Sequence, residues 1–214
     1  MHHTINNLLS LNNEIEKKSN KKANIIAVSK TFPVEKIMPL IEHGHEHFGE
    51  NKVQEALEKW PNLKKNFSNV KLHLIGKLQT NKVKYAVNLF DYIHSVDSIK
   101  LASKISNEQK KSDKKPKIFI QINIGNEIQK SGINKSELKN LYNSCIELDL
   151  DVIGTMCLPP DNGKSELYFS EMKKINENIN LKEISMGMSG DYLEAIKFGS
   201  TFIRIGTKIF GPRS

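Results

Sequence analysis

The sequence of 214 residues contains only two cysteines, one tryptophan and two arginines. It has no apolar run near the ~20 residues that cross a bilayer, which excludes a membrane-spanning helix. Cys145 and Cys157 lie in separate apolar segments without a CxxC pair, so we predict reduced, inert thiols rather than a disulfide framework. The first residues lack the basic region, apolar core and cleavage site of a signal peptide. We therefore expect a cytoplasmic protein with no membrane partner.

Positive charge is plentiful, but arginine is scarce. The net charge is +8, yet the only arginines are Arg204 and Arg213, and the remaining cations are lysines scattered over predicted helix faces. Proteins that grip phosphates bidentately or read bases favour arginine. We therefore expect no nucleic-acid partner despite the basic composition.

Short apolar runs alternate with amphipathic helical stretches along the whole chain, the pattern of repeated βα units. An amphipathic helix around Leu8 and Leu11 comes before the first run. Asp97 is the predicted N-cap of the helix after the fourth strand, and Asn134 with Glu137 predicts a capping box. The predicted strands span residues 24–29, 46–49, 71–75, 92–95, 117–124, 151–156, 183–185 and 201–205. The predicted helices between them include residues 34–42, 52–65, 81–89, 136–148 and 164–178.

Eight such strands predict a single α/β domain over residues 1–214, a (β/α)8 TIM barrel with an additional N-terminal helix. The alternative is an open flavodoxin-like sheet, which needs fewer strands. The second and seventh predicted strands are short enough to keep that alternative open.

Two glycine-containing signatures follow each other near the C-terminus. Residues 185–191 read Ser-Met-Gly-Met-Ser-Gly-Asp and lead into a helical pattern, while residues 204–207 read Arg-Ile-Gly-Thr after a short apolar run. In (β/α)8 barrels the loops after strands 7 and 8 commonly hold a phosphate group. The pair of signatures predicts a phosphorylated ligand.

Lys30 ends the first apolar run, where its ammonium group would be partly desolvated. Desolvation lowers the pKa of a lysine and makes its amine a nucleophile toward a carbonyl carbon. The alternative is a charge that simply reaches solvent from a strand end. Opposite a phosphate site, the same lysine predicts a Schiff base with a phosphorylated aldehyde.

Histidine side chains offer two other interpretations. His43, His45 and His47 alternate along the chain, but no further carboxylate or cysteine spacing completes a metal site, so we predict no metal. His94 is expected at the rim of the barrel rather than as a general base.

The chain resembles the pyridoxal phosphate (PLP) homeostasis proteins, which are related to the barrel domain of alanine racemase. The resemblance runs over nearly the whole chain, and together its motifs are highly specific. They are Ala27-Val28-Ser29-Lys30-Thr31, Phe48-Gly49-Glu50-Asn51-Lys52-Val53-Gln54-Glu55, residues 73–82, Ser185-Met186-Gly187-Met188-Ser189, residues 199–201 and residues 204–211.

The resemblance implies that Lys30 carries PLP as an internal aldimine and that Ser189, Gly206 and Thr207 hold its phosphate. Arg204 matches the residue that faces the pyridine nitrogen. Asn51 and His73 lie in matching motifs near the cofactor. Gly190 departs from the acidic residue of many relatives, and we expect it to loosen the phosphate turn.

A guanidinium can only donate a hydrogen bond, so Arg204 would keep the pyridine nitrogen unprotonated and weaken the cofactor as an electron sink. In alanine racemase a second base, a tyrosine, comes from a separate domain that these 214 residues do not supply. None of the five tyrosines is expected at a strand end that faces the mouth of the barrel. We therefore predict no catalytic residues and a PLP carrier that buffers the aldehyde or delivers it to apo-enzymes. The resemblance also implies a monomer.

A PLP-dependent, racemase-like enzyme is the alternative function, and a basic adaptor that binds RNA or a protein surface is a third. As a further hypothesis, Lys77, Lys82 or Lys84 could be stations for outgoing PLP, although solvated helix charges explain them as well.

Overall fold

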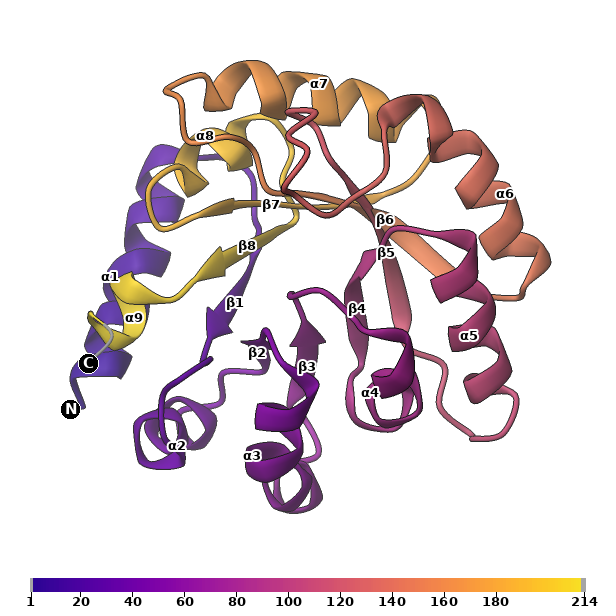
Figure 1. Ribbon diagram of the computed structural model, residues 1–214. Coiled ribbons are helices and arrows are strands. Elements are labelled where there is room, and N and C mark those ends of the chain that lie inside the picture. The colour runs from indigo at the N-terminus through magenta and orange to yellow at the C-terminus, as the bar shows by residue number, and fades with distance from the viewer. Residues whose placement is uncertain (1, 213–214) are drawn as a thin grey trace.

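Eight parallel strands close into a barrel in the computed structural model, which describes residues 2–212 (Figure 1). The strands pair in sequence order, and β8 returns to pair with β1 in parallel register. The predicted (β/α)8 barrel is confirmed, and the open sheet is excluded. The strands are β1 (Asn24–Val28), β2 (His47–Glu50), β3 (Lys71–Leu74), β4 (Tyr92–Val96), β5 (Lys117–Ile122), β6 (Asp151–Cys157), β7 (Glu183–Met188) and β8 (Phe202–Ile205).

Helices cover the outside of the barrel (Figure 1). They are α1 (His3–Lys18), α2 (Val34–Glu42), α3 (Val53–Asn66), α4 (Val83–Leu89), α5 (Ile99–Gln109), α6 (Leu138–Glu147), α7 (Ser165–Asn178), α8 (Tyr192–Lys197) and α9 (Thr207–Phe210). Two 3₁₀ turns, η1 (Thr80–Lys82) and η2 (Lys135–Glu137), lead into α4 and α6.

The helix ends test two of the predictions. The capping box is confirmed, because the Asn134 side chain accepts from the backbone of η2 and Glu137 accepts from the Asn134 N–H. The predicted cap at Asp97 is wrong. Ser98 is the N-cap of α5, and its Oγ accepts from the backbone N–H of Leu101 at 3.2 Å. Both residues are good caps, so the composition of the dipeptide could not decide between them.

The N-terminal helix α1 lies against α2 and α9 and so brings both ends of the chain together (Figure 1). Polar contacts fix this position. The Asn7 side chain donates to the backbone oxygen of Ile209 at 3.0 Å, and the Tyr192 hydroxyl donates to Glu14 at 2.6 Å. The extra helix is therefore joined to α8 and α9, the helices that follow the two C-terminal strands.

The core has two parts. The larger part lies between the strands and the surrounding helices and contains Trp60, which is fully buried. The smaller part fills the barrel interior, where inward-facing side chains meet. It consists of Ile26, Tyr92, Phe119, Met156 and Phe202. Over residues 2–212 the barrel interior is thus packed, as in other barrels of this size.

Candidate functional site

A cavity of about 570 Å³ opens at the carboxyl ends of the strands. This volume is in the range of small-molecule sites. Residues from both ends of the sequence line it, because β1 and β8 are neighbours in the closed barrel. Six of the seven predicted site residues lie in this lining: Lys30, Asn51, Ser189, Arg204, Gly206 and Thr207.

Lys30 follows β1 at the start of a tight turn. The next residue, Thr31, has a φ of 67°, a left-handed conformation that is uncommon for a threonine. The turn is held because the Thr31 N–H donates to Glu55 Oε1 of α3 at 2.5 Å, and the Phe32 N–H donates to the Ser29 oxygen at 3.1 Å. The strained residue thus fixes where the Lys30 backbone stands relative to the cavity.

A buried ion pair lies beneath this turn. Lys59 Nζ contacts Glu50 Oε1 at 2.7 Å and Glu55 Oε1 at 2.8 Å, and it also donates to the backbone oxygen of Ser29 at 3.0 Å. Glu50 is fully buried and accepts further hydrogen bonds from Ser29 and Trp60. Burial raises the pKa of Glu50, while Lys59 and the hydrogen-bond donors oppose that rise. Lys59 therefore joins β2 and α3 to the turn that carries Lys30.

Arg204 projects from β8 into the wall of the cavity and is 4% exposed. Its Nη1 donates to Ser185 Oγ at 2.7 Å, and its Nη2 donates to the backbone oxygen of Cys157 at 2.8 Å. Burial lowers the pKa of Arg204, but the ordinary pKa of a guanidinium is so high that the group stays charged at neutral pH. The cavity wall thus contains a permanent cation that can only donate hydrogen bonds.

The turn after β7 presents Ser189 to the cavity. Gly187 has a φ of 91°, and a Cβ there would lie 2.5 Å from the Ala195 Cβ, so only glycine fits. The Asp191 carboxylate then accepts from the Met188 N–H at 2.7 Å and closes the turn. At Gly190, no atom lies within 4 Å of the place that a Cβ would occupy, so its side of the turn is open.

The seventh predicted residue, His73, is not among the residues that line the cavity. It is fully buried in the barrel interior, where its ring stacks on Tyr92 with centroids 4.1 Å apart. Hydrogen bonds join it to His47 and to His94, each at 2.9 Å. Burial lowers the pKa values of His73 and His94 well below the usual range. A role of His73 in direct contact with a cofactor stays a prediction.

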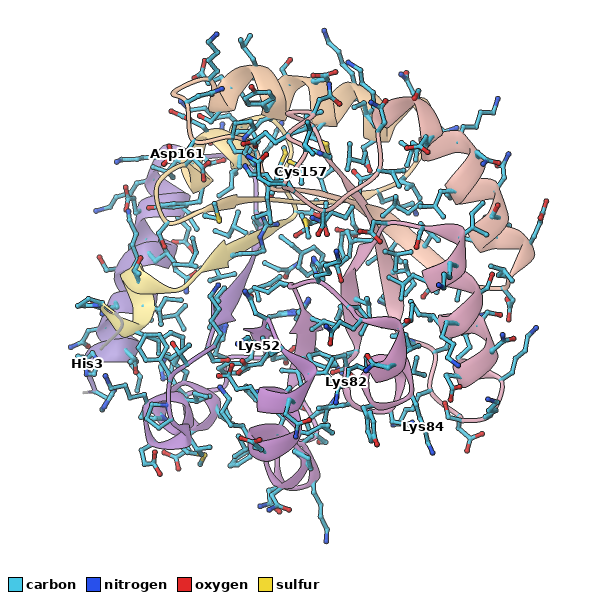
Figure 2. All side chains as sticks on the ribbon, viewed as in Figure 1. His3, Lys52, Lys82, Lys84, Cys157 and Asp161 are labelled. Carbon is cyan, nitrogen blue, oxygen red and sulfur yellow. The ribbon has the colours of Figure 1, made fainter. Side chains whose placement is uncertain are left out.

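Several lining residues were missed by the sequence reasoning. Lys130 reaches the cavity from the loop after β5, where its Nζ pairs with Glu127 and donates to the Pro159 backbone oxygen at 3.1 Å. Asp161 lies in the loop after β6 (Figure 2). These residues stand in loops rather than at strand ends, so no periodic signal marks them. The remaining missed residues are Val28, Ile75, Leu158, Pro159 and Met188.

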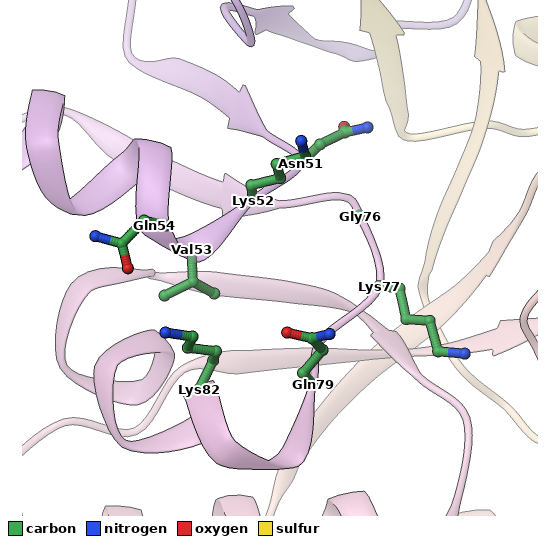
Figure 3. Close-up of a pocket in the computed structure, with 8 residues that line it drawn as sticks. All are labelled: Asn51, Lys52, Val53, Gln54, Gly76, Lys77, Gln79 and Lys82. Carbon is green, nitrogen blue, oxygen red and sulfur yellow. The ribbon is translucent and has the colours of Figure 1, made fainter.

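A second cavity of about 420 Å³ lies beside the first and shares Asn51 with it (Figure 3). Lys52, Lys77 and Lys82 line it, and Figure 3 shows the Lys77 side chain extending away from Lys82 and Gln54. Lys84 is exposed and does not belong to this lining. The hypothesis of lysine stations for outgoing PLP stays a prediction.

Residues 2–212 contain no membrane-spanning helix and no metal-binding cluster, and their two thiols are buried. No helix in this range is long and apolar enough to span a bilayer. No group of three or more His, Cys, Asp or Glu side chains in the same range could hold a metal ion. Cys145 and Cys157 are buried free thiols, and burial raises the pKa of each to about 12, which keeps the nucleophilic thiolate scarce.

Relatives of known kind match nearly the whole chain. Two proteins named pyridoxal phosphate homeostasis protein are similar to it. The one from Aquifex aeolicus is 37% identical over 201 residues, covering 89% of this chain and 87% of the relative. The one from Synechocystis is 38% identical over 199 residues, covering 88% of this chain and 91% of the relative.

Solved structures agree with these sequence relatives. PipY of Synechococcus elongatus, solved with PLP bound, superposes with a TM-score of 0.87 at 31% identity and covers 97% of this chain and all of PipY. An alanine racemase of Clostridium difficile has a TM-score of 0.73 at 17% identity, which shows a shared fold; the match spans 98% of this chain and 56% of the racemase. The family model for the alanine racemase N-terminal domain matches residues 5–214. The chain therefore belongs to the alanine racemase N-terminal domain family and, within it, to the pyridoxal phosphate homeostasis proteins.

Proposed function

We propose that this protein binds PLP in the cavity at the barrel mouth and acts in PLP homeostasis, by buffering the cofactor or delivering it to apo-enzymes. The observation that carries the proposal is that Lys30 and the hydroxyl residues Ser189 and Thr207 line one cavity, although 159 residues separate Lys30 from Ser189 in the sequence. PLP carries an aldehyde, which reacts with an amine, and a phosphate, which accepts hydrogen bonds from hydroxyl and N–H donors. PipY, solved with PLP bound, and the relatives named for PLP homeostasis support this choice.

The residues of the cavity fit the groups of the cofactor. The ε-amino group of Lys30 condenses with the aldehyde carbon and releases one water molecule, and hydrolysis reverses this step. Ser189, Thr207 and the backbone at Gly206 hold the phosphate, and Arg204 donates to the ring nitrogen. Asn51 contributes a neutral polar wall. When bound, PLP supplies an electrophilic carbon that the protein keeps away from other cellular amines.

Arg204 favours a carrier over a catalyst. Strong electron withdrawal by the PLP ring needs a protonated ring nitrogen, which an acidic partner supplies and a guanidinium does not. The Arg204 guanidinium is instead held between Ser185 and Cys157 as a donor. We therefore propose that the protein has no catalytic role of its own.

Amino-acid racemisation is the alternative, and it needs a second base opposite Lys30. No tyrosine belongs to the cavity lining within residues 2–212. Tyr192, the tyrosine nearest in sequence to the phosphate turn, is buried and donates its hydroxyl hydrogen to Glu14. We expect no exchange of the α-hydrogen of alanine with solvent deuterium, and NMR measures this exchange directly.

The test of the proposal is an absorption titration with PLP, followed by borohydride reduction and peptide mass spectrometry. We expect a visible band and a pyridoxyl phosphate adduct on Lys30. Lys30→Ala should lose both. The control is Lys22→Ala, because Lys22 is exposed in the segment before β1. A band and adduct that persist in Lys30→Ala would refute the assignment of the amine.

The proposal extends to the location and the oligomeric state of the protein. We propose a cytoplasmic, monomeric protein in which one domain holds the entire site. Sedimentation velocity at micromolar concentration measures the oligomeric state, and a stable dimer would contradict the monomer.

A further inference from the structure

A continuous row of hydrogen bonds runs through the barrel interior away from Arg204. Arg204 Nη1 donates to Ser185 Oγ at 2.7 Å, and Ser185 Oγ lies 2.9 Å from His94 Nδ1. His94 Nε2 lies 2.9 Å from His73 Nδ1, and His73 Nε2 lies 2.9 Å from His47 Nδ1. His94 and His73 each use one ring nitrogen toward each of two neighbours, and His47 uses Nδ1 toward His73. We call these four residues, Ser185, His94, His73 and His47, the interior chain.

The interior chain crosses the barrel from the cavity side toward its opposite end. Arg204 lines the cavity at the carboxyl ends of the strands, whereas His47 is the first residue of β2 and is partly exposed. Ser185, His94 and His73 between them are fully buried. Water can therefore reach the interior chain at His47, whereas Ser185, His94 and His73 are shielded from it.

Matching donors with acceptors along the interior chain shows which ring nitrogen of each histidine carries the hydrogen. A guanidinium only donates, so Ser185 Oγ must accept from Arg204. If His94 Nδ1 also donated to Ser185, the buried Ser185 hydroxyl hydrogen would have no acceptor among the contacts found within residues 2–212. If Ser185 donates to His94 Nδ1, the hydrogen-bonding groups of the Ser185, His94 and His73 side chains all have a partner. His94 then carries its proton on Nε2 and donates to His73, which in turn donates from Nε2 to His47.

Electrostatics selects the same direction. In the Nε2–H arrangement every imidazole directs its lone pair toward the buried guanidinium and its N–H away from it. The negative ends of the ring dipoles therefore face the positive charge of Arg204. The reverse arrangement would direct each N–H toward that charge. A charged imidazole at His94 would place two cations around one serine hydroxyl.

We propose that the interior chain is neutral and uniformly polarised, with the Nε2–H tautomer at each histidine, and that it positions the Arg204 guanidinium as a fixed donor at the cavity wall. For the identity of the ligand that accepts from Arg204, the inference rests on the proposed function. Because Arg204 can only donate, Ser185 Oγ accepts from it and donates its own hydrogen to His94 Nδ1, which fixes the tautomer of His94. Ser185 and His94 are thus positioning residues, which act on the ligand through Arg204.

The first test needs neither a variant nor a ligand. Long-range ¹H–¹⁵N NMR of the cofactor-free protein with labelled histidine distinguishes Nε2–H, Nδ1–H and doubly protonated rings. We expect neutral Nε2–H rings at His94, His73 and His47 at pH 7.5. An Nδ1–H tautomer or a charged ring at His94 would overturn the proposal. Because PLP is absent, this result does not depend on whether the proposed function holds.

The second test removes the serine hydroxyl that connects Arg204 to the chain. Ser185→Ala should weaken the preference for Nε2–H at His94 so that an Nδ1–H fraction becomes detectable beside it, because neither tautomer then satisfies Nδ1 and only the charge of Arg204 still favours Nε2–H. It should also weaken PLP binding by about tenfold or more, since a hydrogen bond from a charged donor is lost. The matched control is Ser95→Ala. Ser95 is also buried in the barrel wall, but its hydroxyl has no hydrogen-bond partner within residues 2–212.

The two variants separate positioning from general packing. A loss of PLP affinity in Ser185→Ala that Ser95→Ala does not share, together with the tautomer mixture, supports the proposal. Equal affinity in both variants overturns the positioning role. Failure of the proposed function looks different, because a wild-type protein that forms no Lys30 adduct would still show the single set of tautomers.

Discussion

Lowering the pH from 7.5 to 5.5 should destabilise the cofactor-free protein by about 3–4 kcal/mol through the fully buried His73 and His94 and the partly buried His45. Burial lowers the pKa of His45 to about 4 and lowers the pKa values of His73 and His94 well below 6.5. In the unfolded chain these rings return to the ordinary value of about 6.5. As the pH falls below 6.5, these histidine rings become protonated in the unfolded chain but stay neutral in the folded protein.

The magnitude follows from linkage. A group whose pKa is lowered in the folded state contributes stability that is complete above the unfolded pKa and is lost as the pH falls toward the folded pKa. At pH 5.5, one unit below the unfolded value, each such histidine loses about 1.4 kcal/mol. Three histidines lose about 4 kcal/mol. Glu50 opposes this loss in part, because burial raises its pKa and the folded state then gains a proton more readily as the pH falls.

Urea unfolding followed by circular dichroism at the two pH values measures this change in the free energy of unfolding. The cofactor must be removed first, since a bound ligand adds its own stabilisation. His45→Gln should reduce the pH-dependent loss by about 1.4 kcal/mol, because one of the three neutral rings is gone. A wild-type loss below about 1 kcal/mol, or an unchanged loss in the variant, would refute the claim that the folded protein holds these rings neutral.

Three further substitutions test how the site is supported. Lys59→Met should lower the free energy of unfolding by about 3–5 kcal/mol, because the fully buried Glu50 loses its partner; a urea midpoint equal to wild type would contradict this. Gly187→Ala should cost about 1–3 kcal/mol or more and weaken PLP binding, since its φ is positive and a Cβ would collide with Ala195. Gly190→Ala, three residues along, meets no neighbour and should change stability by less than about 1 kcal/mol while keeping the PLP absorption band.

Sequence periodicity predicted the architecture well, because each strand–helix pair carries its own signal. The ends of the predicted strands moved by one to three residues. The seventh strand was predicted as 183–185 and is Glu183–Met188. Its last residues, Gly187 and Met188, read as a loop because glycine weakens a strand pattern. The short helix α9 was not predicted, since four residues carry no periodicity.

The depth of a side chain in the barrel was harder to predict than its strand. His73 is expected near the cofactor because it lies in a motif that resembles the family, yet β3 ends at Leu74 and His73 is fully buried in the packed interior. His47 and His94 join it there through hydrogen bonds across β2, β3 and β4. In the sequence His47 lies 26 residues before His73, and His73 lies 21 residues before His94. No local pattern brings them together, because only barrel closure and strand register do so.

One irregularity in the sheet connects the interior chain to the cavity. Between β7 and β8, Ser185 pairs with Phe202 and Met188 pairs with Arg204, so β7 uses three steps where β8 uses two. The extra residue is accommodated at Gly187, the position with positive φ. Because of this bulge, Ser185 remains in the interior within reach of Arg204, while Ser189 emerges at the mouth beside Gly206. A regular strand of the same length would reverse the face of the residues beyond the bulge. The same glycine therefore serves the phosphate turn and the support of Arg204, which is why we expect Gly187→Ala to affect ligand binding as well as stability.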